Sequence, residues 1–571
     1  MKRNLLKKPI LHIAIITLIL LISGWYLTSF KSFFTVDTGL RFMQIRQLVE
    51  QDWRTFAIDY PQQVLDPNLE HVPYYYAYSV IDGEIYLDVS HIYPLLVSFF
   101  FSVMGTMGLP IVAVAGGLLT AVALYKLSQL TKLPHPEWLL WITIFATPIV
   151  FYSLALWDHT LAAACAAWAV YGMSKSMIQK RWQPAFWAGI FAGFGLAQRP
   201  EMYLFTLVLG LSILIFAWRS WRLVLSFVIS GVLSTCFVWV LQYLWVGHPF
   251  GLAFAPHFFG YGTPDQYIVT ANSFSPLYKY TFLLFYVEPG IMLTFVATLL
   301  ILVGTILIVF SLRLANLRKP VWLLAGGMAC VVGYGLLMYW SRYGIIPGII
   351  STFPLIALSL TFIDEENGRY TKIHRFVSLV TFLFLGGMLL VWPSYGGRQW
   401  GARYLLVAYP LLAFLAFYTY STVSTKLDTQ MKKTLQYVTA ALLITSILMQ
   451  FMGVRALYIV KIDKAKQQKL VASLEPDIFV TDKTQAHLPP AMSPLTDKLF
   501  LQTGNDENRE ALFNHLQAEN VQQFGYITLA ENDKPPFPAG TCYVLDEEQS
   551  LPQCGGSSSC WIYQLSANCG Q

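Results

Sequence analysis

Two aspartates in the sequence stand just beyond long apolar runs, where a membrane surface would place them beside a lipid-borne substrate. Asp37 follows the apolar run of residues 9–30, and Asp158 follows the run of residues 138–155. Partial removal of a carboxylate from water raises its pKa toward neutral, which suits Asp37 for accepting a proton from a substrate hydroxyl. Charged residues at such positions tend to be functional, so Asp158 is a second catalytic candidate.

The alternative for both aspartates is helix capping, because Asp is a favoured N-cap residue. Asp37 precedes the stretch 40–49, which predicts an amphipathic helix with Arg41 and Arg46 exposed. Asp158 precedes the next predicted helix. The sequence leaves the choice between capping and catalysis open for both residues.

Three arginines are candidates for holding a phosphate group, because guanidinium groups offer paired donors that match its oxygens: Arg403, Arg398 and Arg199. The first two lie in Gly396-Gly-Arg-Gln-Trp-Gly-Ala-Arg403, where glycines let the backbone approach a ligand closely. Arg403 is favoured because it enters an apolar run beside aromatic residues. The alternatives are interfacial anchoring and, for Arg199, neutralisation by Glu201.

Four further residues are candidates for binding an acceptor or a divalent metal ion: His159, Glu84, His91 and His257. His159 adjoins Asp158, but two adjacent ligands are too few to define a metal site. Each of the others, taken alone, is more often an ordinary polar surface residue. The sequence therefore assigns no cofactor and leaves a divalent ion open.

Four cysteines cluster near the C-terminus: Cys542, Cys554, Cys560 and Cys569. Such a cluster is typical of one or two disulfides on the oxidising side of a membrane. The alternative is a zinc site, but the cluster has no Cys-x-x-Cys pair and no close histidine. We therefore expect disulfides and an extracytoplasmic C-terminal segment.

The composition tells which elements must position these residues. The chain has 571 residues, of which 56% are hydrophobic and 12% are charged. Soluble domains carry about 25% charged residues, so a soluble globular protein is excluded, as are a disordered chain and a disulfide-rich miniprotein. The net charge of +6 is no nucleic-acid signal, because the position of basic residues matters more in a membrane protein than their sum.

The apolar runs predict about 13 transmembrane helices, each of roughly 20 residues. The basic N-terminus predicts a retained signal anchor with its start in the cytoplasm. Most later Lys and Arg then mark cytoplasmic turns, provided that residues 91–107 form an interfacial or re-entrant helix. An odd number of spans places the C-terminal segment outside. No Gly-x-x-x-x-Gly-Lys-Ser/Thr motif is present, which argues against an ATP-driven pump.

We expect a polytopic α-helical membrane domain over residues 1–454, with a first extracytoplasmic loop at 31–108 that carries interfacial helices. Residues 455–571 then form an extracytoplasmic C-terminal domain. Its short β-rich runs, near 478–480, 498–502, 524–529, 542–545 and 561–565, alternate with polar helical stretches such as 507–519, which predicts a small α/β domain.

This layout resembles the GT-C superfamily of polyprenyl-phosphate-sugar-dependent glycosyltransferases, in particular the protein O-mannosyltransferase-like enzymes and the aminoarabinose transferase of lipid A. The phrases that carry the resemblance are Val36-Asp37-Thr-Gly-Leu-Arg-Phe-Met-Gln, Ala146-Thr-Pro-Ile-Val-Phe-Tyr-Ser with Trp157-Asp158-His, and Gly396-Gly-Arg-Gln-Trp-Gly-Ala-Arg403-Tyr-Leu-Leu. The resemblance covers residues 10–452. It implies that Asp37 is the catalytic acidic residue of the first outer loop and Asp158 the second acidic position. Protein mannosyltransferases usually carry an Asp-Glu pair here, whereas Thr38 follows Asp37, which points to another acceptor.

The predicted function is an inverting membrane glycosyltransferase with Asp37 as general base. Its partners would be a polyprenyl-phosphate sugar, membrane lipids and an extracytoplasmic glycan, lipid or protein acceptor, in the plasma (inner) membrane of a prokaryote. The alternatives are a lipid-linked-sugar transporter or flippase, an oligosaccharide ligase and a non-catalytic envelope assembly protein. A transporter favours internal repeats and mid-span ionisable residues, which the sequence does not clearly contain. An assembly protein would tolerate substitution of both aspartates.

Overall fold

The computed structural model describes most of the chain, and every structural statement below concerns these residues. They are residues 9–74, 77–256, 276–287, 291–314, 319–342, 344–361, 369–391, 399–482, 485, 488–503, 506–529, 543–553 and 556–565.

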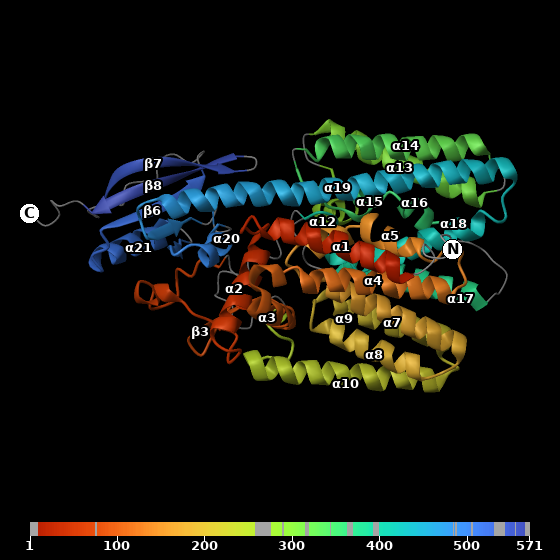
Figure 1. Ribbon diagram of the computed structural model, residues 1–571, viewed down its shortest axis with the longest axis horizontal. Helices are drawn as coiled ribbons and strands as arrows, with labels where there is room; N and C mark the ends of the chain where they lie inside the picture. Colours follow the sequence, from red (N-terminus) through yellow and green to blue (C-terminus); the bar gives the residue numbers. More distant parts are fainter. Residues whose placement is uncertain are drawn as a thin grey trace, which may run out of the picture.

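Apolar helices make up the larger part of the molecule, as the composition predicts (Figure 1). Seven of the described helices are long and apolar enough to cross a membrane: α1 Pro9–Thr28, α4 Ile111–Leu130, α10 Trp221–Val246, α13 Met292–Arg313, α14 Pro320–Trp340, α17 Arg369–Val391 and α19 Thr429–Ser473. The other predicted runs form helices that are shorter, broken or less apolar: α5 Trp138–Phe145, α6 Ile149–Leu154, α7 His159–Gln179, α8 Gln183–Leu196, α9 Glu201–Ala217, α12 Pro276–Leu284, α15 Ile349–Thr352, α16 Ile356–Ser359 and α18 Ala408–Val423. The prediction of a polytopic helical membrane protein is confirmed.

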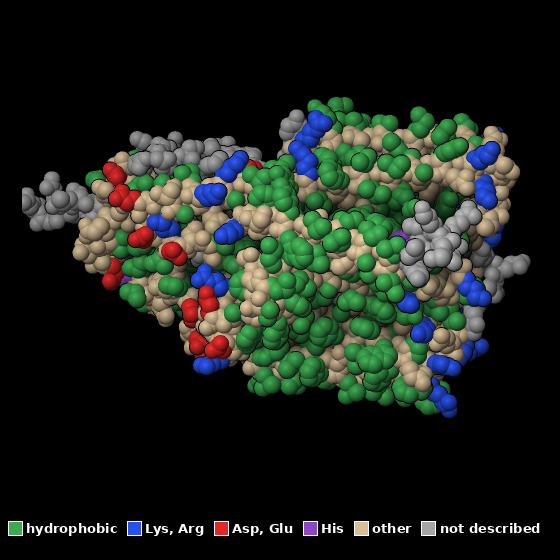
Figure 2. Space-filling view, in the orientation of Figure 1, with side chains coloured by type: hydrophobic (Ala, Val, Ile, Leu, Met, Phe, Trp, Pro, Cys, Tyr) green, Lys and Arg blue, Asp and Glu red, His purple; other side chains and the backbone are tan. Residues whose placement is uncertain are grey.

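The two ends of this bundle differ in charge. On the face shown in Figure 2, hydrophobic side chains cover the middle of the bundle and Lys and Arg gather at its right-hand end. We call this the basic end. The opposite end carries the C-terminal domain and most of the visible Asp and Glu, and we call it the domain end.

The first loop folds at the domain end into a helix, a small sheet and a second helix: α2 Val36–Glu50, β1 Ala57–Ile58, η2 Pro61–Val64, β2 Tyr78–Ile81, β3 Glu84–Leu87, α3 Ile92–Met104 and η3 Gly105–Gly108. The strands are antiparallel in the order β1-β3-β2. Helix α3 and η3 together form a shorter apolar helix, Ile92–Gly108, than the seven spanning candidates. The interfacial or re-entrant character of residues 91–107 stays a prediction.

The C-terminal domain is the predicted α/β unit. It contains β4 Ile478–Thr481, α20 Pro489–Met492, η6 Ser493–Leu495, β5 Leu499–Gln502, α21 Asp506–Ala518, β6 Gln523–Leu529, β7 Tyr543–Gln553 and β8 Gly556–Leu565. The sheet order is β5-β4-β6-β8-β7, in which β4 pairs in parallel with β5 and β6 and the remaining pairs are antiparallel. Helix α19 runs without a break from the bundle into this domain (Figure 1).

The first loop and the C-terminal domain share one hydrophobic core. Tyr74 and Leu87 of the loop belong to the same buried cluster as Leu501 of the domain. The backbone of Gln502 also donates a hydrogen bond to the carbonyl oxygen of His71 over 2.9 Å. The loop that carries Asp37 is therefore held against the domain as well as against the bundle.

Of the predicted disulfide cysteines, only Cys560 lies among the described residues. It is buried in β8 within the core formed with Phe479 and Phe500. Cys542, Cys554 and Cys569 lie outside the described part of the chain, so the pairing stays a prediction.

Candidate active site

Asp37 lies in the first turn of α2 and points toward Arg403. The N-cap of this helix is Thr35, whose backbone N–H donates to the hydroxyl of Thr38 over 3.0 Å. The capping interpretation of Asp37 is therefore wrong, and its side chain is available for another contact. Asp37 Oδ2 lies 2.6 Å from Nη1 of Arg403, and the Asp37 side chain remains 34% exposed.

Arg41 was expected at the surface, but it is buried and joins the two candidate aspartates. Its Nη1 donates to the backbone oxygen of Asp37 and its Nη2 to Oδ2 of Asp158, both over 2.9 Å. The prediction of an exposed Arg41 is wrong, because this side of α2 packs against the bundle, where Arg41 pairs with the carboxylate of Asp158. Arg46, one turn further, is half exposed as predicted and pairs with Glu50.

Asp158 sits at the N-cap position of α7, yet its side chain makes no capping hydrogen bond. It is instead 1% exposed and surrounded by cationic or polar groups. Arg41 donates to Oδ2, while His159 Nδ1 lies 3.1 Å and Arg199 Nη1 3.6 Å from Oδ1. A buried carboxylate requires such partners, so this aspartate is fixed in place by the residues around it.

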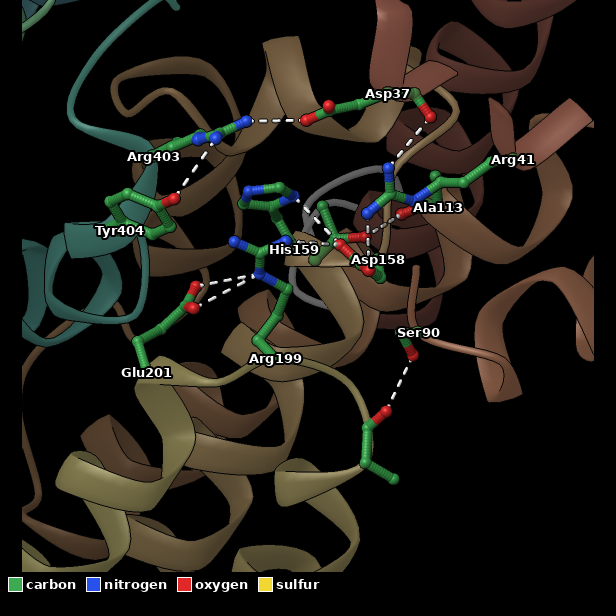
Figure 3. A network of polar contacts seen from close by, with 12 residues as sticks. Asp37, Arg41, Ser90, Ala113, Asp158, His159, Arg199, Glu201, Arg403 and Tyr404 are labelled. Carbon is green, nitrogen blue, oxygen red and sulfur yellow. Dashed lines mark hydrogen bonds and ion pairs between the residues drawn. The ribbon is translucent and has the colours of Figure 1, made fainter. Parts of the chain in front are cut away.

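Arg199 and Arg403 approach each other around the ring of Tyr404 (Figure 3). Their guanidinium carbons lie 5.7 Å and 4.9 Å from the ring centroid. Arg199 is also held by Glu201, whose Oε1 accepts from its Nε over 3.1 Å, as the neutralisation alternative anticipated. Three arginines and three carboxylates thus form one network, contributed by α2, the α6–α7 turn, the start of α9 and η5 Arg403–Leu405.

The electrostatics of Asp37 differ from the expectation. Burial raises the pKa of Asp37, but the guanidinium groups of Arg403, Arg41 and Arg199 outweigh this effect, and the net result is a pKa below the usual value. The expectation of a raised pKa is therefore wrong for this state of the site, because arginines from three separate segments of the chain surround this one carboxylate. The lowered pKa favours the ionised form of Asp37, which pairs with Arg403.

Of the remaining candidates that the structure describes, neither Glu84 nor His91 joins this network. Glu84 is exposed on β3 and accepts a hydrogen bond from Tyr86. His91 is buried against the ring of Phe56, and burial lowers its pKa to about 3. Arg398 and His257 lie outside the described residues.

A metal site does not emerge from those candidates that the structure describes. Within the described part of the chain, no group of three or more His, Cys, Asp and Glu residues is placed to hold a metal ion. Asp158 and His159 are adjacent, but Asp158 is already engaged by Arg41 and Arg199. These two residues do not fit a divalent ion, and we assign no chemical step to one.

Several residues of the site were not predicted. Arg41 could have been suspected from its position four residues after Asp37, which places both on one face of a helix. Tyr404 and the buried Tyr152 gave no separate signal within their aromatic, apolar surroundings. The Tyr152 hydroxyl and both amide atoms of Gln198 are buried without a hydrogen-bond partner among the described residues, which leaves polar groups near the network for a ligand.

Comparison with known proteins gives structural similarity only. No family model and no curated protein matches the chain. The structure is similar to that of ArnT from Cupriavidus metallidurans bound to undecaprenyl phosphate, at 10% identity and a TM-score of 0.48, over 97% of this chain and 98% of that chain. It is also similar to ArnT from the same organism in the apo state, at 10% identity and a TM-score of 0.49, over 97% of each chain.

Proposed function

We propose that the protein is a membrane-embedded inverting glycosyltransferase that moves a sugar from a polyprenyl-phosphate donor to an extracytoplasmic acceptor. The observation that carries this proposal is the Asp37–Arg403 pair. It joins a partly exposed carboxylate to a guanidinium group that is 18% exposed, at the domain end of an apolar bundle. Such a pair supplies both a proton acceptor and a phosphate ligand at one place.

The distribution of charge supports an outward-facing site. Basic residues gather at the end of the bundle opposite to the network. Positively charged loops remain on the cytoplasmic side of membrane proteins. The proposed orientation therefore places the basic end in the cytoplasm, and the network, the first loop and the C-terminal domain outside. The membrane would be the plasma membrane of a prokaryote.

Arg403 and Arg199 are proposed to bind the donor phosphate. Both guanidinium groups flank Tyr404, so a phosphate between them would meet donors from two sides. During transfer the bond between the anomeric carbon and the phosphate oxygen breaks, and its electron pair remains on the phosphate. Positive charge that is already in place stabilises this leaving group without reorganisation.

Asp37 is proposed to act as the general base. The acceptor hydroxyl attacks the anomeric carbon from the face opposite to the phosphate while its proton passes to a carboxylate oxygen of Asp37. Arg403 now holds that carboxylate at 2.6 Å. A donor phosphate that shares Arg403 weakens this pair and brings a second negative charge nearby, and both effects raise the pKa of Asp37 toward the range of a useful base.

Asp158 is proposed as a positioning residue. It holds Arg41, which in turn holds the backbone oxygen of Asp37. Asp158 therefore acts on the base through the turn of α2 that carries it. No metal ion is needed for this connection.

A transfer assay with purified protein tests the proposal. The protein is incubated with a panel of polyprenyl-phosphate sugars and with glycan, lipid and protein acceptors, and products are read by mass spectrometry. Asp37→Asn is expected to lower the rate by about 10² to 10⁴, the contribution of a general base. Glu50→Gln is the matched control, because Glu50 lies on the same helix and also pairs with an arginine, but is half exposed and remote from the network. Undiminished transfer by folded Asp37→Asn protein would falsify the assignment of the base.

A further inference from the structure

A groove opens on the outside of the bundle between α4, α7 and α8. It encloses about 540 Å³, and its lining is mainly aliphatic and aromatic. Leu119 of α4 and Trp187 of α8 line it and are 46% and 59% exposed on the apolar surface of the bundle. A hydrocarbon chain can therefore enter the groove sideways from the bilayer.

The polar part of the lining lies at one end of the groove. The described lining contains one charged side chain, Lys175 of α7, and one amide, Gln183 of α8. Lys175 lies near the end of α7 and Gln183 begins α8, so both flank the turn that joins the two helices. This turn belongs to the basic end of the bundle (Figures 1 and 2). Toward the domain end the lining is apolar and finishes at Leu161 and Phe194.

The indole of Trp168 fixes the floor of the groove. Its ring stacks on that of Phe191 at 5.8 Å, and its Nε1 donates to the backbone oxygen of Leu119 over 3.1 Å. One side chain therefore ties α4, α7 and α8 together. A preformed apolar surface of this kind can bind a chain without first ordering its own side chains.

The same hydrogen bond sets the register of two lysines. Helices α4 and α7 run in the same direction, because Thr160 bonds to Ala113 and Trp168 to Leu119 further along both helices. Lys126 comes seven residues after Leu119, and Lys175 comes seven residues after Trp168. Residues seven apart share one face of a helix. The two lysines therefore lie at the same height, at the basic end of the groove.

Neither lysine is neutralised by a neighbouring side chain. Nζ of Lys126 lies 5.7 Å from the ring centroid of Tyr125, and Nζ of Lys175 lies 5.7 Å from that of Tyr171. Within the part of the chain that the structure describes, no carboxylate pairs with either ammonium group. The polar end of the groove thus carries two positive charges beside aromatic rings, which is a setting that attracts an anion.

The length of the groove matches one leaflet of a bilayer. From Leu161 to Lys175, α7 rises about 21 Å at 1.5 Å per residue. One leaflet takes up half of a hydrocarbon core of roughly 30 Å. An acyl chain that starts at Lys175 and runs toward Leu161 therefore stays against the apolar lining through the full depth of its leaflet.

We propose that this groove binds an anionic glycerophospholipid, with its phosphate at Lys126 and Lys175 and one acyl chain along Trp168. Charge complementarity selects this occupant, because the cationic end of the groove lies at the membrane surface and the rest is apolar. Basic pockets between transmembrane helices are recurrent sites for anionic headgroups. The lipid comes from the leaflet at the basic end, which is the cytoplasmic leaflet in the proposed orientation. The site is separate from the ion-pair network and from the proposed transfer.

Photolabelling of the full chain tests this site. The protein is reconstituted in phosphatidylcholine with a trace of phosphatidylglycerol that carries a photoreactive group in its acyl chain, and the labelled peptides are mapped. We expect label on α7 and α8 that unlabelled phosphatidylglycerol displaces and added phosphatidylcholine does not. Lys126→Gln and Lys175→Gln should each weaken this displacement about fivefold, the contribution of one lysine near a membrane surface. Lys433→Gln is the matched control, because Lys433 is exposed near the start of α19, away from the groove.

Two further variants test the apolar part of the groove. Ala164→Phe fills it, since Ala164 lines the groove and is buried, and should abolish the label on α7 and α8. Ala440→Phe is its control, because Ala440 is exposed on the apolar surface of α19. Trp187→Ala removes an exposed edge without overfilling the bundle, and should reduce the label even if Ala164→Phe does not fold.

Thermal unfolding in the two lipids gives an independent measurement. A ligand that binds the native state stabilises it. The wild type should therefore melt at a higher temperature in phosphatidylglycerol than in phosphatidylcholine. The double variant Lys126→Gln/Lys175→Gln should lose this difference, while a wild-type melting temperature in phosphatidylcholine shows that it is folded.

Several outcomes would overturn the site. They are label spread over the whole surface of the bundle, equal displacement by both phospholipids, displacement that both lysine variants leave unchanged, and stronger displacement by a prenyl phosphate than by phosphatidylglycerol. None of these measurements requires turnover. The lipid site and the proposed transferase activity can therefore fail independently of each other.

Discussion

The two aspartates of the site have opposite surroundings. Asp37 is one-third exposed and has one strong side-chain partner, Arg403. Asp158 is almost completely buried and is contacted by Arg41, His159 and Arg199. A group that exchanges protons with a substrate must be reachable and must be able to change partners, which only Asp37 satisfies. Asp158 is suited to hold other residues in place.

The strongest test of this contrast is stability. Replacement of Asp158 by Ala leaves Arg41 and Arg199 buried with a partner missing, and breaking a buried ion pair from one side costs about 3–5 kcal/mol. Asp37→Asn breaks a partly exposed pair, which is worth about 0–1 kcal/mol. We therefore expect a large fall in melting temperature for Asp158→Ala and a small one for Asp37→Asn, measured by thermal unfolding in detergent. Equal falls would remove the distinction between the two residues.

The next effect concerns Arg403. Loss of a preorganised donor to a developing anion typically costs about 10²–10³ in rate, so Arg403→Gln should lower kcat by that order while the fold is retained. Arg403→Lys keeps the charge but loses the planar pair of donors, so its kcat should lie between that of the wild type and that of Arg403→Gln. Initial rates over a range of donor concentrations measure both. A wild-type rate in Arg403→Gln would mean that the phosphate is held elsewhere.

The smallest effect is on pH dependence. In the free protein, burial raises the pKa of Asp37, but the charges of the neighbouring arginines lower it by more. The ionised base therefore persists as the pH falls and is lost only below the usual pKa range of an aspartate. The acid limb of kcat/KM reports the free protein, and that of kcat reports the substrate complex. If phosphate draws Arg403 away, the acid limb of kcat lies at higher pH than that of kcat/KM. Arg403→Gln should move the kcat/KM limb upward, and coincident limbs in the wild type would contradict the exchange of partners.

Local patterns predicted the elements well but not the contacts between them. Apolar runs of the right length became helices, and the β-rich runs near 478, 500 and 525 became neighbouring strands, because both signals depend on short stretches of sequence. Asp37 and Arg403 were proposed separately, but they meet across 366 positions, and Arg41 meets Asp158 across 117. A single sequence does not show such pairs. For this reason Arg41 was placed in water and the pKa of Asp37 was given the wrong direction.

The unbroken helix α19 has a mechanical consequence. Its 45 residues make a rod of about 68 Å, more than twice the thickness of a bilayer core. One end is packed in the bundle, while the other enters the domain whose core also contains the first loop. Because successive residues of a helix are rotated by about 100° about its axis, a continuous helix fixes the orientation of the domain about that axis as well as its distance from the bundle. If the proposed transfer takes place, the distance between the site and the domain is then set by the length of a helix rather than by a moving lid.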